Sequence, residues 1–104
     1  MVNYKIIWAP RASSRLLEIY NYLIYKLKEP ITARNLYNKI LYETSKLKCF
    51  PAKYPDLSYY GKINKNYRRL RVDKFIIIYK VDFDTPKVFI LDIFHSNQNY
   101  LNLI

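Results

Sequence analysis

The stretch YRRLRVDKFIIIYKVDFDTPKVFILDIFH, residues 67–95, decides the fold because it predicts three consecutive β-strands joined by short turns. Successive side chains of a strand point to opposite faces of the sheet. In the first strand, one face therefore carries Arg68, Leu70 and Val72, and the other face carries Tyr67, Arg69 and Arg71.

The second and third strands complete an antiparallel meander. Phe75–Val81 is almost continuously apolar, as expected of a central strand that is buried on both faces. Asp73-Lys74 is predicted to form a two-residue hairpin loop, although it lacks the glycine that such turns favour. Residues 83–87 give a second turn signal before the strand Val88–Phe94.

Two amphipathic helices are predicted upstream of the meander. Residues 10–28 form the first, with Pro10 in its first turn, and Glu29-Pro30 ends it. Thr32 is the predicted N-cap of the second helix. So short a link predicts an antiparallel hairpin whose apolar stripe packs on one face of the sheet. The stripe consists of Leu16, Leu17, Tyr20, Leu23, Ile24 and Leu27 in the first helix, and Ala33, Leu36, Tyr37, Ile40, Leu41, Thr44 and Leu47 in the second.

The remaining segments are short. Residues 4–8 are β-rich, residues 50–66 read as an irregular connector, and residues 96–104 form a tail. We therefore predict one domain, residues 1–104, of the α+β class: an N-terminal strand, an α-helical hairpin and a three-stranded antiparallel meander.

The charge and cysteine content limit the possible partners and environment. The formal net charge is +10, from 18 Lys and Arg against 8 Asp and Glu, which favours anionic partners such as nucleic acid, ribosome or an acidic protein. The lone Cys49 excludes an internal disulfide and predicts a reduced, packed thiol. No membrane-spanning run or signal peptide is visible, so we expect a cytoplasmic protein without a membrane partner.

The densest group of positive charges is a candidate binding surface for nucleic acid or another target. Such cations neutralise phosphates, and neighbouring tyrosines offer stacking faces to bases. The alternative is a solvated edge whose tyrosines pack into the core. We favour the binding surface because the charges gather on one strand and its preceding loop. The group consists of Lys62, Lys65, Arg68, Arg69, Arg71 and Lys74.

His95 is the only histidine and ends an apolar strand next to the arginine-bearing hairpin. A lone histidine in such a place is more often structural than catalytic, yet it is a possible general acid or base beside a phosphate-binding arginine. A single histidine and a single cysteine cannot form a metal cluster, and no glycine-rich phosphate loop is present. We therefore expect neither metal nor cofactor.

Several short segments follow one another in a family-like order: YKIIWAP (4–10), IYNYL (19–23), PITA (30–33), FP (50–51), YRRL (67–70), YKVD (79–82), IFH (93–95) and YLNLI (100–104). This order resembles the RelE/ParE superfamily of bacterial toxins from type II toxin–antitoxin systems, over nearly the whole chain. The resemblance implies a microbial RNase-like toxin fold. It also implies a cognate antitoxin, encoded nearby, whose C-terminal segment wraps the toxin.

The superfamily holds two activities. RelE-like members cleave messenger RNA in the ribosomal A site without metal, whereas ParE-like members poison DNA gyrase. In a RelE-like protein Arg71 would hold the scissile phosphate, and His95 or Tyr100 would transfer protons. Arg68 matches the arginine common to ParE-like strands. The arginine pair usual just after His95 is replaced by Ser96-Asn97-Gln98, which removes a cationic group that would stabilise the transition state.

The missing arginine pair and the long helical hairpin favour a toxin that arrests growth by poisoning DNA gyrase. The alternative is a ribosome-dependent mRNA endoribonuclease, and a third possibility is an inactive toxin-derived binding protein. The expected partners are accordingly the antitoxin and either DNA gyrase or the ribosome with its message.

Overall fold

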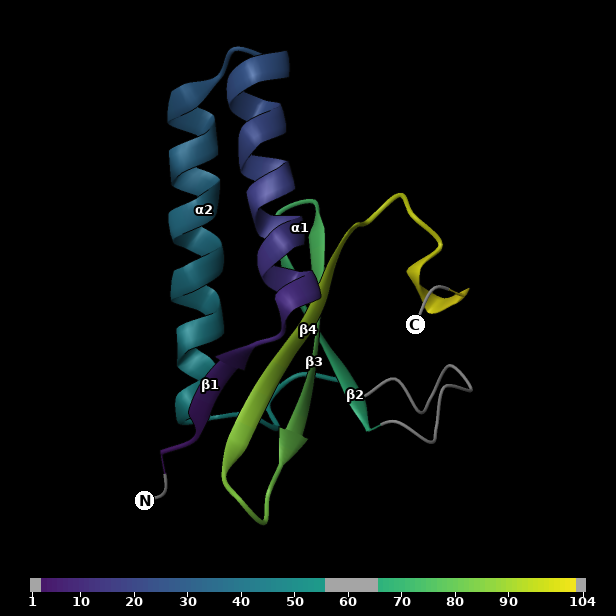
Figure 1. The fold of residues 1–104 in the computed structure, drawn as a ribbon. Helices are drawn as coiled ribbons and strands as arrows, with labels where there is room; N and C mark the ends of the chain where they lie inside the picture. Colours follow the sequence, from purple (N-terminus) through teal and green to yellow (C-terminus); the bar gives the residue numbers. More distant parts are fainter. Residues whose placement is uncertain (1–2, 56–65, 103–104) are drawn as a thin grey trace.

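The computed structural model describes residues 3–55 and 66–102, in which two helices cover one face of a four-stranded sheet (Figure 1). The strand order is β1-β4-β3-β2, with β1 parallel to β4 and the other pairs antiparallel. The predicted α+β order of strand, helical hairpin and meander is confirmed, and the N-terminal strand joins the meander at its edge. The elements are β1 (Lys5–Trp8), α1 (Pro10–Asn21), α2 (Pro30–Ser45), β2 (Tyr67–Val72), β3 (Phe75–Asp82) and β4 (Lys87–His95).

The first helix changes form before it ends. Pro10 is its first residue, as predicted, and Asn21 is followed by a π-helical segment, Tyr22–Lys26, in which Leu27 N–H donates to Tyr22 O at 3.1 Å. Lys28 then takes a left-handed conformation with φ of 58°. A residue with positive φ cannot continue a right-handed helix, so the predicted helix over residues 10–28 ends at Lys26.

The second helix begins three residues before the position that the sequence suggested. Pro30 is its first residue and Glu29 is the N-cap, with no side-chain capping hydrogen bond. The prediction of Thr32 as N-cap is therefore wrong. Proline has a fixed φ that suits a helix, and its missing N–H is one that the first turn leaves unpaired, so Pro30 starts the helix itself.

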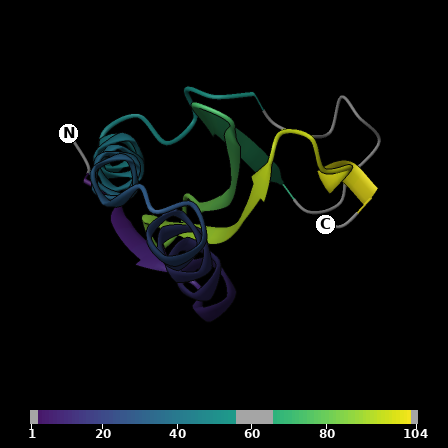
Figure 2. The ribbon, with the colours of Figure 1, turned by 90° about the horizontal axis from the view of Figure 1, so that it is seen from above.

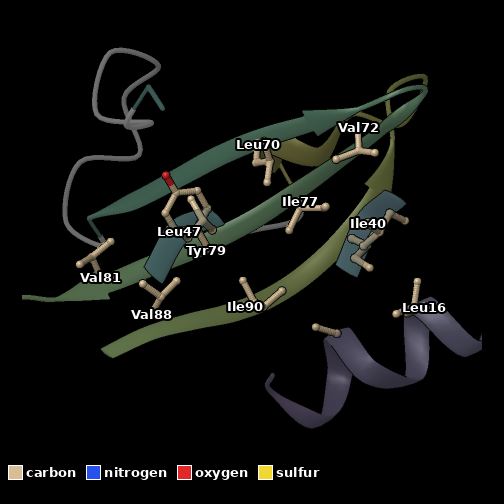
Figure 3. Close-up of a cluster of buried hydrophobic side chains, with 12 residues drawn as sticks. Leu16, Ile40, Leu47, Leu70, Val72, Ile77, Tyr79, Val81, Val88 and Ile90 are labelled. Carbon is tan, nitrogen blue, oxygen red and sulfur yellow. The ribbon is translucent and has the colours of Figure 1, made fainter. Parts of the chain in front are cut away.

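The main core lies between the helices and the sheet (Figures 2 and 3). Its buried side chains come from α1, α2, the 3₁₀ turn after α2 and all three strands of the meander. Only the inner half of each helical stripe takes part, because the hairpin extends past the end of the sheet (Figure 1). The buried members are Ala12, Leu16, Ile40, Leu47, Leu70, Val72, Ile77, Tyr79, Val81, Val88, Ile90 and Ile93.

A second, smaller apolar cluster lies on the other face of the sheet, which we call the open face because neither α1 nor α2 covers it. Ile76, Ile78 and Phe94 form it together with Tyr100 from the C-terminal segment, which lies on this side (Figure 2). Like the other strands, β4 contributes to both faces, and a β-bulge changes which of its side chains take each face. Ile78 pairs with Asp92 and Tyr79 with Ile90, so the residue between them is extra and the alternation of β4 switches there.

Two local expectations have different outcomes. The Asp73-Lys74 turn is confirmed, and Asp73 supplies the positive φ, 53°, that such a turn requires. Cys49 is exposed, so the packed thiol is wrong: the short 3₁₀ turn Lys46–Lys48 that follows α2 buries Leu47 and leaves the next residues outside. Residues 56–65 of the predicted connector lie outside the described residues.

Candidate functional site

Strand alternation divides the three arginines of β2 between the two faces, as predicted. Arg68 shares the helix-covered face with Leu70, and its Nη1 donates to Tyr54 O at 2.9 Å and to Ala52 O at 3.4 Å. These bonds hold the chain segment that follows α2 against the sheet. Arg68 therefore has a structural task, although it belongs to the predicted cluster of binding cations.

Arg69 and Arg71 lie on the open face. Successive residues on one face of a strand are about 6.6 Å apart. The Cα atoms of Arg69 and Arg71 therefore have a spacing close to that of neighbouring phosphates in one nucleic-acid strand. Arg71 is exposed, and its Nε donates to Asp73 O at 3.0 Å. Lys80, on the same face by register with Tyr67, is also exposed. The open face thus presents a row of cations.

The other predicted cations are less well defined. Lys74 is exposed in the turn between β2 and β3, at the end of the sheet. Lys62 and Lys65 lie outside the described residues. The predicted cluster is therefore split: one arginine is structural, two lie on the open face, and one lysine lies at the tip of the hairpin.

Tyr100 belongs to the open face as well. It is buried, with 9% of its surface exposed, and its ring stacks on Phe94 with centroids 6.2 Å apart. The Arg69 guanidinium donates a hydrogen bond to the Tyr100 hydroxyl. One of the two residues predicted for proton transfer in a RelE-like protein is thus held beside an arginine, and little of it meets solvent.

His95 ends β4 on the opposite side, among the residues that face the helices. Its ring packs edge-on against Phe75 with centroids 5.5 Å apart, and its Nδ1 accepts a hydrogen bond from Asn97 N–H at 3.0 Å. Gln98 Oε1 accepts from His95 N–H at 2.8 Å. The segment Ser96-Asn97-Gln98 therefore closes the strand end with local hydrogen bonds, and in a neutral ring the proton lies on Nε2.

The three candidate catalytic residues do not converge on one point of the fold. Arg71 pairs with Ile76, and Ile76 with Phe94, which places Arg71 and Tyr100 over the same face. His95 pairs with Phe75 and faces the helices. Sequence patterns could not place His95 on the helix-covered face, because the bulge in β4 decides which face its last residues take.

An apolar groove that the sequence did not predict opens on the helix-covered side. It has a volume of about 980 Å³ and lies between the outer half of the hairpin and the β2–β3 turn. Leu23, Leu27 and Leu36 supply much of its wall. At its mouth, Lys39 forms an ion pair with Asp73 at 2.6 Å. The groove exists because the helical stripe is longer than the sheet beneath it.

Burial raises the pKa of the Tyr79 phenol to about 12, and its hydroxyl donates to Pro51 O at 2.8 Å. Tyr79 is therefore a core residue and does not reach a substrate.

Across residues 3–55 and 66–102, no three His, Cys, Asp or Glu side chains gather as metal ligands. Within the same described part, neither helix combines the length and apolar character that crossing a bilayer requires.

Comparison with known proteins agrees with this geometry. Residues 6–100 match the family described as the ParE toxin of the type II toxin–antitoxin system parDE, so the chain belongs to this family. It is thus a toxin of a type II toxin–antitoxin system, as its resemblance to the RelE/ParE superfamily predicted. No curated protein matches its sequence.

Two solved structures share the fold. One is the chromosomal ParDE toxin–antitoxin system from P. aeruginosa, with a TM-score of 0.72 and 19% identity over 88% of this chain and 95% of that chain. The other is the toxin–antitoxin complex RelBE2 from Mycobacterium tuberculosis, with a TM-score of 0.64 and 16% identity over 90% of this chain and 99% of that one.

Proposed function

We propose that this toxin arrests growth by poisoning DNA gyrase, as ParE-like members of the superfamily do. One observation carries the proposal: Arg71 and His95 lie on opposite faces of the sheet. Metal-independent RNA cleavage needs a proton acceptor and a proton donor close to the scissile phosphate. The match to the ParE family over residues 6–100 supports the same choice.

A ribosome-dependent mRNA endoribonuclease is the second candidate, because Arg69, Arg71 and Tyr100 share the open face. Two arginines there would bind the scissile phosphate and stabilise its developing charge. Tyr100 would be the proton carrier on that face. Its burial against Phe94 speaks against ready access to a ribose hydroxyl, so we rank this activity lower.

We also propose that a cognate antitoxin neutralises the toxin and that the apolar groove takes part in binding it. The RelBE2 structure is a toxin–antitoxin complex, and the ParDE structure is of a toxin–antitoxin system. In this chain the groove leaves Leu27 45% exposed, and an apolar segment of a partner would remove that surface from water. The net charge of +10 favours an acidic partner.

The deciding experiment adds the purified toxin to DNA gyrase with relaxed plasmid and ATP. We expect loss of supercoiling and accumulation of plasmid with gyrase-linked breaks. Arg71→Ala is expected to keep part of this inhibition. The control Arg11→Ala, which changes an exposed cation of α1, is expected to behave as the unchanged toxin.

A parallel cell-free translation reaction separates the alternatives. If gyrase poisoning is right, the 5′ ends of the message stay intact and translation continues. New 5′ ends within codons that depend on translation and disappear in Arg71→Ala would establish the endoribonuclease instead. Harmless expression in cells without any antitoxin, with neither effect in vitro, would identify an inactive toxin-derived protein.

A further inference from the structure

An ion pair links helix α1 to the open face across the edge of the sheet. β1 pairs with β4 along Lys87–Ile90, and within residues 3–55 and 66–102 the rest of β4 has no strand neighbour on that side. Arg15 lies beside this segment, and its Nε is 3.2 Å from Asp92 Oδ1. The Asp92 side chain is only 8% exposed, and the same oxygen accepts from Ile93 N–H at 2.8 Å.

The same arginine supports the aromatic residues of the open face. Its Cζ lies 5.8 Å from the centroid of the Phe94 ring, the arrangement of a cation–π contact. Phe94 in turn stacks on Tyr100, and the Tyr100 hydroxyl accepts a hydrogen bond from Arg69. An unbroken series of contacts therefore runs from α1 to an arginine of the cationic row.

The register adds a second, electrostatic connection. Asp92 pairs with Ile78, and Ile78 pairs with Arg69, so Asp92 and Arg69 lie on one face in one row. Neighbouring strands are about 4.8 Å apart, which puts their backbones about 9.6 Å from each other. A long arginine side chain can cover that distance. A buried carboxylate without a partner attracts any cation within reach, because leaving it unpaired is costly.

We propose that Arg15 is a positioning residue that keeps the Arg69 guanidinium at the Tyr100 hydroxyl, on the open face of the sheet. By pairing with Asp92, Arg15 removes the charge that would otherwise draw Arg69 down onto the sheet. By packing on Phe94, it holds Tyr100 where the phenol oxygen receives the Arg69 guanidinium. Arg15 needs no contact with the target to act in this way.

The first test needs no target and therefore does not depend on the proposed function. The nuclear magnetic resonance signals of the Arg69 guanidinium and the Tyr100 ring are recorded in the full chain. Arg15→Met is expected to shift both sets of signals. The matched control Arg11→Met changes another α1 arginine, which is exposed, and is expected to shift neither.

A rescue distinguishes positioning from general support of the fold. Asp92→Asn keeps the shape of the side chain and removes its charge, so the double variant Arg15→Met/Asp92→Asn is expected to return the Arg69 signals toward their original positions. If Arg15 merely stabilised the fold, the second substitution would leave the signals displaced or displace them further. Should Arg15→Met not fold, Arg15→Gln keeps a hydrogen-bond donor without the charge, and the same outcomes apply.

Gyrase inhibition supplies the functional arm, which rests on the proposed function. Arg15→Met is expected to weaken inhibition about fivefold or more, in the range of a typical coupling between sites, and the double variant is expected to recover it. An Arg69 signal that stays unmoved in Arg15→Met overturns the positioning role. If the toxin without any substitution leaves gyrase active, the proposed function is wrong. The role of Arg15 is then still tested by the magnetic resonance signals of Arg69.

Discussion

The two faces of the sheet contrast most clearly at two neighbouring residues of β3. Ile77 and Ile78 have relative exposures of 0% and 1%, but they point in opposite directions. Ile77 packs in the cluster closed by two helices, whereas Ile78 lies under Tyr100 and beside the cationic row. The two isoleucines are equally buried but differ in role. Ile77 stabilises the core under the helices, and Ile78 belongs to the apolar layer beside the cations of the open face.

Truncation of these two isoleucines tests the contrast most strongly. Ile77→Ala is expected to lower the free energy of unfolding by about 4 kcal/mol, and Ile78→Ala by about 2.5 kcal/mol, within the range for buried isoleucine truncations. The helices cannot close the cavity under Ile77, but the C-terminal segment can settle onto Ile78. Urea unfolding monitored by circular dichroism measures both. Equal losses would show that the open face is as rigid as the covered one.

Alkaline pH is expected to weaken the helix-covered face. Burial raises the pKa of Tyr79 to about 12, whereas a tyrosine in the unfolded chain titrates near 10. Between these values the unfolded state loses a proton that the folded state keeps, so the free energy of unfolding falls, by about 2 kcal/mol in total. Below pH 10 Tyr79 has no such effect.

Thermal unfolding at several pH values between 9 and 12 measures this decline. In Tyr79→Phe the decline is expected to be shallower, because the group that titrates differently in the two states is gone. The variant also loses the hydrogen bond to Pro51 O, so its stability at neutral pH is lower and only the slopes are compared. Identical slopes in the two proteins would exclude Tyr79 as the cause.

The arginines of β2 are expected to divide in the same way as the faces. Arg68→Met removes bonds to Tyr54 O and Ala52 O and is expected to cost about 1.5 kcal/mol of stability, as charged hydrogen bonds do. Arg71→Met, at an exposed site on the open face, is expected to change stability by less than about 0.5 kcal/mol. Denaturant midpoints compare the two, and a reversed order would contradict the assignment of Arg68 to structure.

The smallest effect is expected at the mouth of the groove. The Lys39 and Asp73 side chains are 52% and 48% exposed, so their ion pair is screened by water despite the 2.6 Å separation. Lys39→Met is expected to lower stability by about 0.5 kcal/mol or less, and the difference is expected to vanish at high salt. A large, salt-resistant loss would mean that the pair holds the two sides of the groove together.

Much of the fold follows from local patterns in the sequence. Local residue spacing predicts the strands and the helical hairpin, because alternation in β2, the apolar run of β3 and the helical periodicity depend only on neighbouring residues. The same alternation separates Arg68 from Arg69 and Arg71. The errors were local too. Thr32 lost its capping role because Pro30 begins the helix, and Cys49 follows a tight turn that leaves it exposed.

The candidate site was less predictable because its contacts join distant parts of the chain. Arg15 and Asp92 are 77 residues apart, and nothing near either of them in the sequence indicates the pair. The groove depends on the length of the hairpin relative to the sheet. The bulge in β4 sets His95 toward the helices and Phe94, on which Tyr100 stacks, toward the open face, and it appears only in the register between β3 and β4.

The sequence by itself determined the element order, the family and the supply of positive charge. These depend on residue type and on spacing along the chain. Strand alternation separates Arg68 from Arg69 and Arg71, but only the tertiary structure decided which face the helices cover and therefore which of these cations holds the fold together. The reason is physical: the task of a charged side chain depends on the carboxylate, carbonyl or aromatic ring beside it, and packing alone brings those groups together.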